Sequence, residues 1–298
     1  MKVTVEKLPK SQLKLVVKVD KNEVEETYQQ VLQKNVETTE IEGFRKGKAP
    51  KQKVEQKVGV SKLYGDTINE LLQKYYPQAI KENYINPISN PKVEIKEFEL
   101  NKDFEFDAIV ALKPEIKIGD FRKELKKYYE EKNKQVKLEN AERLKKGEKL
   151  EHEHAHIHPS EVIEELIKVT QVEIPELLIE EETNRTMSRL VDQINATGMK
   201  VEDYLKAQST TIDQLKENYD RISERSLKTE LILGDLVKQE KVTVEEKEID
   251  NAIMASGVEN PQELLNNTFQ RVYIRTILEK NKLVTKLMEE TEGENHAK

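Results

Sequence analysis

The chain has 298 residues, which is enough for two or three domains of ordinary size. Charged residues make up 36% of it and aromatic residues 5%, with no Trp, a composition that favours helices exposed on several sides over one large core. The net charge of −7 excludes a protein whose whole surface coats nucleic acid, and the absence of Cys excludes disulfides, thiol catalysis and Cys-ligated zinc.

The chain begins with the sequence MKVTVEKLPK, in which charges interrupt every short apolar run. This pattern has neither the apolar centre of a secretory signal nor a span of about 20 apolar residues. We therefore expect a cytoplasmic protein with no membrane partner.

Residues 1–115 have the pattern of an α+β domain. The apolar positions within residues 3–19 alternate with polar ones, as in half-buried strands. Residues 20–32 have helical spacing behind a capping Asp, and a longer helical stretch runs from near Ser61 to before Pro87. Alternation returns within residues 93–112. The order β-β-α-α-β-β predicts an antiparallel sheet with its helices on one face.

A glycine-bearing loop stands between the two predicted helices, with the sequence Gly43-Phe44-Arg45-Lys46-Gly47-Lys48-Ala49-Pro50. Two glycines and a proline oppose regular structure, so Phe44 and its neighbouring cations stand on a tight loop. Up to Lys53 the segment contains no acid and five cations, namely Arg45, Lys46, Lys48, Lys51 and Lys53. Such a cluster beside an exposed aromatic residue can neutralise phosphates and stack against an RNA or protein surface. The alternative is a solvated turn whose Phe44 folds back into the domain.

Residues 116–159 are nearly all charged or polar, with too few apolar positions to bury a helix face. We predict a linker here, in part a solvated helix. Near its end stand four of the five histidines of the chain, His152, His154, His156 and His158. They share one face of an extended segment or pair at i,i+4 on a helix, and either geometry suits Zn²⁺, Ni²⁺ or Cu²⁺. The alternative is a hydrophilic linker with incidental metal affinity.

Residues 160–298 predict an all-α domain of five or six helices, with capping signals at Thr211, Thr243 and Asn260. The last of its apolar stripes includes Phe269, Val272, Tyr273 and Ile277. Other apolar residues, such as Leu227, Leu231, Ile274 and Leu278, lie off the main stripes. They could line an amphiphilic groove or pack against neighbouring helices, which is the commoner arrangement.

The loop sequence GFRKGKAP resembles the ribosome-docking signature of the trigger factor family of bacterial chaperones, Gly-Phe-Arg-x-Gly-Lys-x-Pro, at every fixed position. The order of elements around the loop is also that of the family's N-terminal domain. Two later segments, VIEELIKVTQVEIPELLIEEE and TELILGDLVKQEKVTVEEKEI, resemble the family's helical C-terminal domain. The resemblance covers residues 1–115 and about 160–290.

This resemblance implies a ribosome-associated chaperone that binds nascent chains at the tunnel exit and assists their folding and export. Its partners would be the large ribosomal subunit, through protein and rRNA, and unfolded nascent polypeptides. Family members often form homodimers when free, and the sequence leaves this state open for the present chain. The docking residues implied are Gly43, Phe44, Arg45, Lys46, Gly47, Lys48 and Pro50. As candidate client-binding residues we take Met187, Leu190, Leu227, Leu231, Ile274 and Leu278. We expect an extended molecule of several domains.

The sequence departs from the family pattern between its two matching parts. Family members normally carry an FKBP-type prolyl isomerase of about 90–100 residues there, whereas about 45 mostly charged residues stand in this chain. We also find no GxSxG, P-loop, dinucleotide or HExxH motif and no cofactor signal. We therefore predict a holdase that is not an enzyme. A ribosome-independent holdase and a prolyl isomerase are the alternatives.

Overall fold

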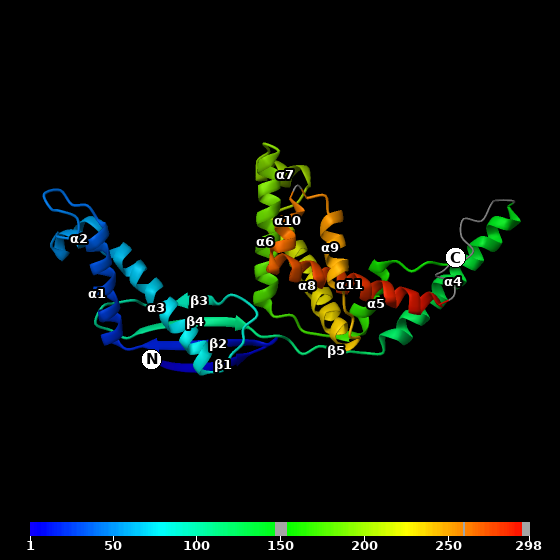
Figure 1. The fold of residues 1–298 in the computed structure, drawn as a ribbon, viewed down its shortest axis with the longest axis horizontal. Coiled ribbons are helices and arrows are strands. Elements are labelled where there is room, and N and C mark those ends of the chain that lie inside the picture. The colour runs from blue at the N-terminus through cyan, green and yellow to red at the C-terminus, as the bar shows by residue number, and fades with distance from the viewer. Residues whose placement is uncertain (147–153, 259, 294–298) are drawn as a thin grey trace. The chain divides into compact units, whose positions relative to one another are not determined.

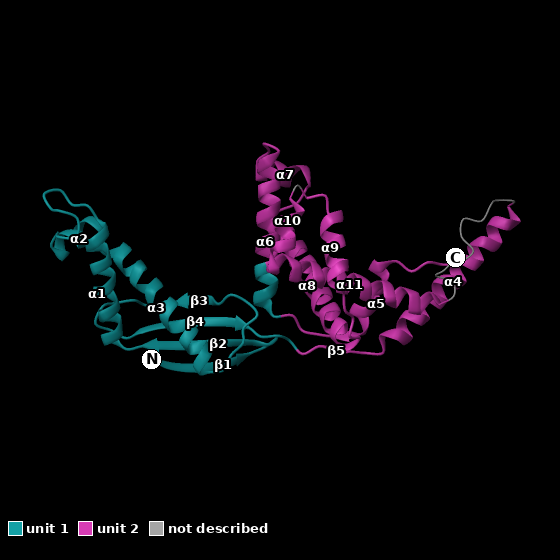
Figure 2. Cartoon of the chain, in the orientation of Figure 1, with its two compact units in different colours: residues 1–114, 175–181 teal, residues 115–174, 182–298 magenta. Residues whose placement is uncertain are grey.

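The computed structural model describes residues 1–146, 154–258 and 260–293, and the chain forms two compact units (Figures 1 and 2). The N-terminal unit consists of residues 1–114 and 175–181, and the helical unit consists of residues 115–174 and 182–298. The predicted fold class, an α+β domain followed by an all-α domain, is confirmed.

The N-terminal unit contains a four-stranded antiparallel sheet in the order β1-β2-β4-β3. Its elements are β1 (Lys2–Leu8), β2 (Gln12–Val19), α1 (Lys21–Thr38), α2 (Lys51–Val58), α3 (Val60–Glu82), β3 (Lys92–Ile95) and β4 (Phe104–Ala111). Helix α2 is the one element of this unit that the sequence pattern did not predict. It begins after Pro50 and ends at Gly59, whose φ of 88° is unfavourable for residues with a side chain.

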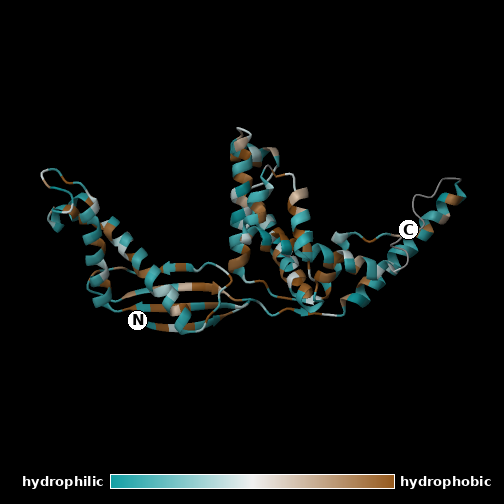
Figure 3. Cartoon of the chain, in the orientation of Figure 1, coloured by the Kyte–Doolittle hydropathy of each residue, from teal (hydrophilic) through white to brown (hydrophobic). Residues whose placement is uncertain are grey.

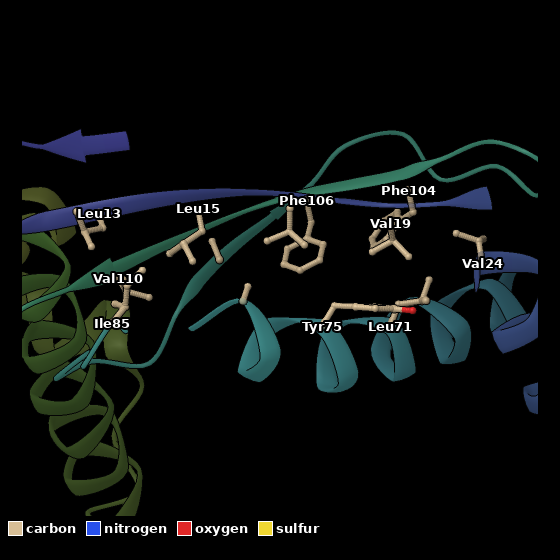
Figure 4. Close-up of a cluster of buried hydrophobic side chains, with 13 residues drawn as sticks. Leu13, Leu15, Val19, Val24, Leu71, Tyr75, Ile85, Phe104, Phe106 and Val110 are labelled. Carbon is tan, nitrogen blue, oxygen red and sulfur yellow. The ribbon is translucent and has the colours of Figure 1, made fainter. Parts of the chain in front are cut away.

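The core of this unit lies between the sheet and α3. Strands β2 and β4 pair Val17 with Phe106, so alternate residues of both strands share one face. Figure 4 shows Phe106 and Val19 of this face directed toward helix α3, which carries Leu71 and Tyr75. A second apolar cluster joins α1, α2 and the start of α3, and it includes Tyr28, Leu32, Ala49, Val54 and Leu63.

The helical unit has eight helices in the part of the chain that the structure describes, and seven of them lie after residue 158. Its elements are β5 (Lys117–Ile118), α4 (Phe121–Lys145), α5 (Pro159–Val169), β6 (Thr170–Gln171), α6 (Glu176–Ala196), α7 (Val201–Ala207), α8 (Ile212–Gln239), α9 (Glu246–Ala255), α10 (Pro261–Asn266) and α11 (Thr268–Glu292), although the first residues of α6 belong to the N-terminal unit. The sequence predicted five or six helices in this region, and the described residues contain seven. The difference comes from α7 and α10, which are short helices of 7 and 6 residues.

One predicted helix start lies two residues too early. The sequence placed a cap at Thr243, whereas Glu245 is the N-cap of α9, and its backbone amide donates a hydrogen bond to Glu248 Oε2 at 2.8 Å. The carbonyl oxygen of Thr243 instead accepts a hydrogen bond from Lys282 Nζ of α11 at 3.1 Å. A tertiary contact therefore holds Thr243 in the connection before the helix.

The predicted linker is wrong in one respect, because part of it is core. Helix α4 buries Phe121, Leu125 and Tyr129, and Ile157 is buried shortly before α5. The cluster that contains Phe121, Leu125 and Ile157 also includes residues of α5, α8 and α11, among them Val162, Leu166, Leu236, Leu283 and Leu287. The three apolar residues of α4 recur every four positions, so they cover only its first turns. The charged composition of the whole segment concealed this short stripe.

Ion pairs also attach α4 to the rest of the helical unit. Arg122 contacts Glu240 Oε2 at 2.8 Å and Glu290 Oε2 at 3.0 Å, and Lys286 Nζ contacts Glu240 Oε2 at 2.8 Å. The hydrogen bonds from Arg122 and Lys286 lower the pKa of Glu240 to about 2.

Among the described residues, no helix is both long and apolar enough to cross a membrane.

Candidate functional site

The loop between α1 and α2 consists of two consecutive tight turns. The amide of Phe44 donates to the carbonyl of Ile41 at 3.1 Å, and the amide of Lys48 donates to the carbonyl of Arg45 at 2.9 Å. Gly43 and Gly47 occupy the third position of their turns with φ of 80° and 79°. A positive φ at the third position, with none at the second position (Glu42 or Lys46), is the pattern of a type II turn and favours glycine. A Cβ on either glycine would meet no atom within 4 Å, so the requirement is conformational and not one of space.

The tip of this loop, residues 43–48, presents its side chains to solvent. Phe44 is 44% exposed and is not folded back into the domain. Arg45, Lys46 and Lys48 have no ion pair or side-chain hydrogen bond with any residue in the described ranges. The loop therefore offers an aromatic ring and free cations together, as an RNA or protein contact requires.

Both ends of the loop are anchored to the N-terminal unit. Ala49 is buried in the cluster between α1 and α3, and Ile41 packs against the same cluster. After the loop, Tyr28 of α1 donates a hydrogen bond to Glu55 of α2. Burial, reinforced by this hydrogen bond, raises the pKa of Tyr28, so its hydroxyl remains a donor. Fixed ends on a small loop limit how far the tip can move.

A second candidate surface lies on the first half of α11. Phe269 is 89% exposed and Tyr273 is 64% exposed, and Val272 and Ile277 are exposed beside them. These four residues, which we call the open stripe, recur at helical spacing of three and four residues. The same stripe continues along α11 to Leu283, Val284 and Leu287, which are buried in the core of the helical unit.

Helix α9 contacts the first half of α11 on another side, through charges. Arg271 pairs with Glu246 at 2.5 Å and with Asp250 at 2.6 Å, and Arg275 also pairs with Glu246. About 100° of rotation per residue places these arginines on nearly the opposite side of α11 from the open stripe. The helix is thus held in place while its apolar stripe stays uncovered.

The histidine-rich segment forms no metal centre in the described part of the chain. His154, His156 and His158 line a cavity of about 460 Å³ with residues of α4, and His152 lies outside the described residues. His156 Nδ1 lies 3.4 Å from Glu292 Oε2. Within residues 1–146, 154–258 and 260–293, no three His, Asp or Glu side chains are grouped as metal ligands.

Comparison with known families decides the relationship of the chain. The family model of the bacterial trigger factor protein matches residues 1–146, and the model of its C-terminus matches residues 134–289, which is more than half of the chain. The chain belongs to the trigger factor family. The two matches overlap at residues 134–146, and no model of a prolyl-isomerase domain matches the chain.

Individual relatives support the same family. The trigger factor of Natranaerobius thermophilus is 38% identical over 122 residues, which are 41% of this chain and 27% of the relative. The trigger factor of Staphylococcus carnosus is 40% identical over 122 residues, again 41% of this chain and 28% of the relative. The chain therefore aligns with little more than a quarter of the length of these curated relatives.

A solved structure extends the likeness to the whole fold. It is described as "Promiscuous Substrate Recognition in Folding and Assembly Activities of the Trigger Factor Chaperone", and it matches with a TM-score of 0.64 at 14% identity. The match covers 98% of this chain and 100% of that one. At this identity, the likeness establishes a shared fold with that trigger factor chain.

The structure places the predicted docking residues together but distributes the predicted client-binding residues. Met187, Leu190, Leu227, Leu231, Ile274 and Leu278 are all half-buried, and Leu278 lines a cavity of about 740 Å³ with residues of the connection before α9. The open stripe is more exposed than these candidates, and its members belong to the last of the predicted apolar stripes of this trigger-factor-family chain. Spacing revealed the stripe. Whether another helix covers it depends on residues far away in the sequence.

Proposed function

We propose that this chain is a chaperone that docks on the ribosome through residues 43–48 and holds unfolded polypeptides through apolar surface on its helical unit. The single observation that carries the docking part is the loop itself, where Phe44 and unpaired cations stand on two glycine turns. Membership of the trigger factor family supports the assignment. The partners proposed are protein and rRNA near the exit of the large ribosomal subunit.

The physical basis of docking is a small cluster of complementary contacts. Arg45 supplies a planar fork suited to carboxylate or phosphate, which a lysine does not reproduce. Phe44 supplies apolar area at the contact, and a few such residues can provide most of the affinity of an interface. If two to four loop cations meet phosphates, log K should fall against log[salt] with a slope of roughly −1.5 to −3.5.

Client holding is proposed for the open stripe of α11, because exposed apolar patches mark interaction surfaces. Further exposed apolar residues lie on neighbouring elements of the same unit, among them Ile212 and Ile222 of α8 and Met254 of α9. Separate side chains of this kind accept many partners without demanding one shape. The half-buried Met187, Leu227 and Ile274 would add to this surface where helices move apart.

We further propose that the chain lacks prolyl-isomerase activity. Rotation about a prolyl bond crosses a barrier of about 18–20 kcal/mol, and lowering it requires a pocket that binds the twisted amide. The two family matches leave no residues between them for such a domain. Acceleration of a proline-limited refolding reaction by catalytic amounts of the full chain would contradict this proposal.

The docking proposal is tested by pelleting the full chain with ribosomes through a sucrose cushion at two salt concentrations. The variant Phe44→Ala/Arg45→Ala/Lys46→Ala should lose at least about 100-fold in ribosome affinity, because interface hot spots contribute 2 kcal/mol or more each. Its unfolding free energy should stay within about 0.5 kcal/mol of the parent, as for exposed positions.

A matched control is Lys62→Ala/Lys81→Ala/Tyr84→Ala, which removes two exposed cations and one exposed aromatic side chain from the same unit. This control changes the net charge by the same amount as the loop variant, and it should bind ribosomes with the same affinity as the parent. Equal pelleting of the parent and the loop variant, with both folded by circular dichroism, would overturn docking by this loop. A ribosome-independent holdase would then be the better proposal.

A further inference from the structure

Helix α4 gathers many of its lysines on one face. Since an α-helix turns about 100° per residue, six lysines fall within one sector about 100° wide. This lysine face consists of Lys123, Lys126, Lys127, Lys134, Lys137 and Lys145. Glu130 is the one acid within that sector. The buried Phe121, Leu125 and Tyr129 lie on the other side of the helix.

The lysine face is exposed and largely without counter-charges. All six side chains are exposed. Lys127 Nζ lies 3.5 Å from Glu124 Oε1, but the other five lysines have no ion pair or side-chain hydrogen bond with any residue that the structure describes. By contrast, Lys132 on the inner side of α4 pairs with Glu161 at 2.6 Å. The result is a row of six cations along roughly 33 Å of helix, five of them unpaired among the described residues, on a chain whose net charge is −7.

We propose that the lysine face of α4 binds the phosphate backbone of duplex RNA without reading its sequence. A duplex presents closely spaced phosphates over the length of this row, and lysines neutralise them as point charges without a fixed fork geometry. Duplex RNA is recognised mainly by such shape and backbone contacts. No residue of the loop at 43–48 takes part, so this inference stands apart from the proposed docking function.

A lipid surface suits the lysine face less well. A helix that lies in a membrane interface buries an apolar face among the lipids, with lysines beside it. In α4 the apolar residues Phe121, Leu125 and Tyr129 are already buried in the helical unit. Figure 3 shows α4 as a mainly hydrophilic helix, and within the lysine face Leu144 is the one large apolar side chain. Charge is therefore the main feature that the lysine face offers to a partner.

The test is the affinity of the full chain for a fluorescein-labelled RNA duplex of 20 base pairs, measured by anisotropy at several salt concentrations. In this test the parent is the full chain with the substitutions Phe44→Ala/Arg45→Ala/Lys46→Ala, so that the loop at residues 43–48 does not contribute to RNA binding. Adding Lys123→Gln/Lys126→Gln/Lys134→Gln/Lys137→Gln should reduce affinity at 50 mM salt by more than 10-fold. The slope of log K against log[salt] should become shallower by about 3 to 4, since four phosphate contacts at about 0.9 each are lost. Gln and Lys have similar helix propensity, so α4 should remain helical.

The matched control is Lys200→Gln/Lys216→Gln/Lys238→Gln/Lys247→Gln, four exposed lysines of the same unit outside α4. It changes the net charge equally and should alter affinity by less than about 3-fold. Equal losses in the two variants, or no measurable duplex binding by the parent, would overturn the proposal. Binding to vesicles of 30% phosphatidylserine in phosphatidylcholine should not depend on the α4 lysines, and a dependence stronger than that for RNA would assign the face to membranes instead.

Discussion

Phe44 and Phe269 are both aromatic side chains in solvent, but different features of the chain expose them. Phe44 stands on a loop whose shape is set by Gly43 and Gly47, within four residues of it in the sequence. Phe269 stands on a regular helix, and its stripe is buried further along the same helix at Leu283 and Leu287. Exposure of Phe44 is thus a local property, whereas exposure of Phe269 depends on which distant helices cover α11.

The loop around Phe44 and the stripe around Phe269 represent two different kinds of exposed surface. A loop held by glycine turns presents a few residues in one shape, which suits a single partner. A helix stripe left uncovered presents apolar area without a fixed shape, which suits many partners. The two surfaces should therefore respond differently to substitutions of side chain and of backbone.

The largest expected effect contrasts the covered and the open halves of α11. Leu287→Ala should destabilise the chain by about 2–5 kcal/mol, because it leaves a cavity in a buried cluster. Phe269→Ala should change stability by no more than about 0.5 kcal/mol, because the ring is 89% exposed. Urea unfolding followed by far-UV circular dichroism measures both. Comparable losses would show that the open stripe is covered in solution.

The next effect concerns the backbone of the loop. Gly43→Ala should weaken ribosome binding by about 10-fold without removing any contacting side chain, because a left-handed conformation costs Ala about 1–2 kcal/mol. Gly43→Asn is the matched control and should weaken binding less, since Asn tolerates a positive φ at this turn position. If the two variants bound equally to pelleted ribosomes, the turn would not determine the docking shape.

A smaller effect is expected for client holding. Phe269→Ser/Tyr273→Ser should raise roughly 5-fold the amount of chain needed to suppress aggregation of a chemically unfolded protein, since each ring contributes only part of its full burial of about 1.5–3 kcal/mol. Leu138→Ser/Leu144→Ser removes two exposed apolar side chains from α4 and should have no effect. A greater loss in the α4 variant would place client binding elsewhere.

The smallest effect concerns pH and the attachment of α4. The folded-state pKa of Glu240 is lowered to about 2 by Arg122 and Lys286, below the ordinary value of 4.5, so its contribution is fully present above pH 4.5 and is lost as pH falls toward 2. Glu240→Gln should therefore lower stability at pH 7 by about 1 kcal/mol or less, because both partner side chains are partly in water. Thermal unfolding at pH 7 and pH 3 should show the difference between parent and variant shrinking at the lower pH. A difference that stays constant would mean that Glu240 is not held by these ion pairs.

The helix caps show which features of the fold can be predicted from neighbouring residues alone. Asp20 caps α1 and accepts from the amide of Asn22 at 2.9 Å, and Thr211 and Gln214 form the expected capping box at α8. These signals operate within one helical turn, so the sequence reveals them. Thr243 has the same local signal but lies in the connection before α9, where its carbonyl accepts a hydrogen bond from Lys282 of α11.

The sequence by itself determined the strands of the N-terminal unit, most of the long helices, the loop at residues 43–48 with its glycines and the family resemblance, because each depends on periodicity or turn chemistry between near neighbours. Only the tertiary structure decided that Phe121, Leu125 and Tyr129 are core and that Phe269 and Tyr273 are surface. The physical reason is that burial is a property of pairs of surfaces. A stripe of apolar residues indicates that a helix can be covered along one side. How much of that side is covered depends on which other helices the fold packs against it.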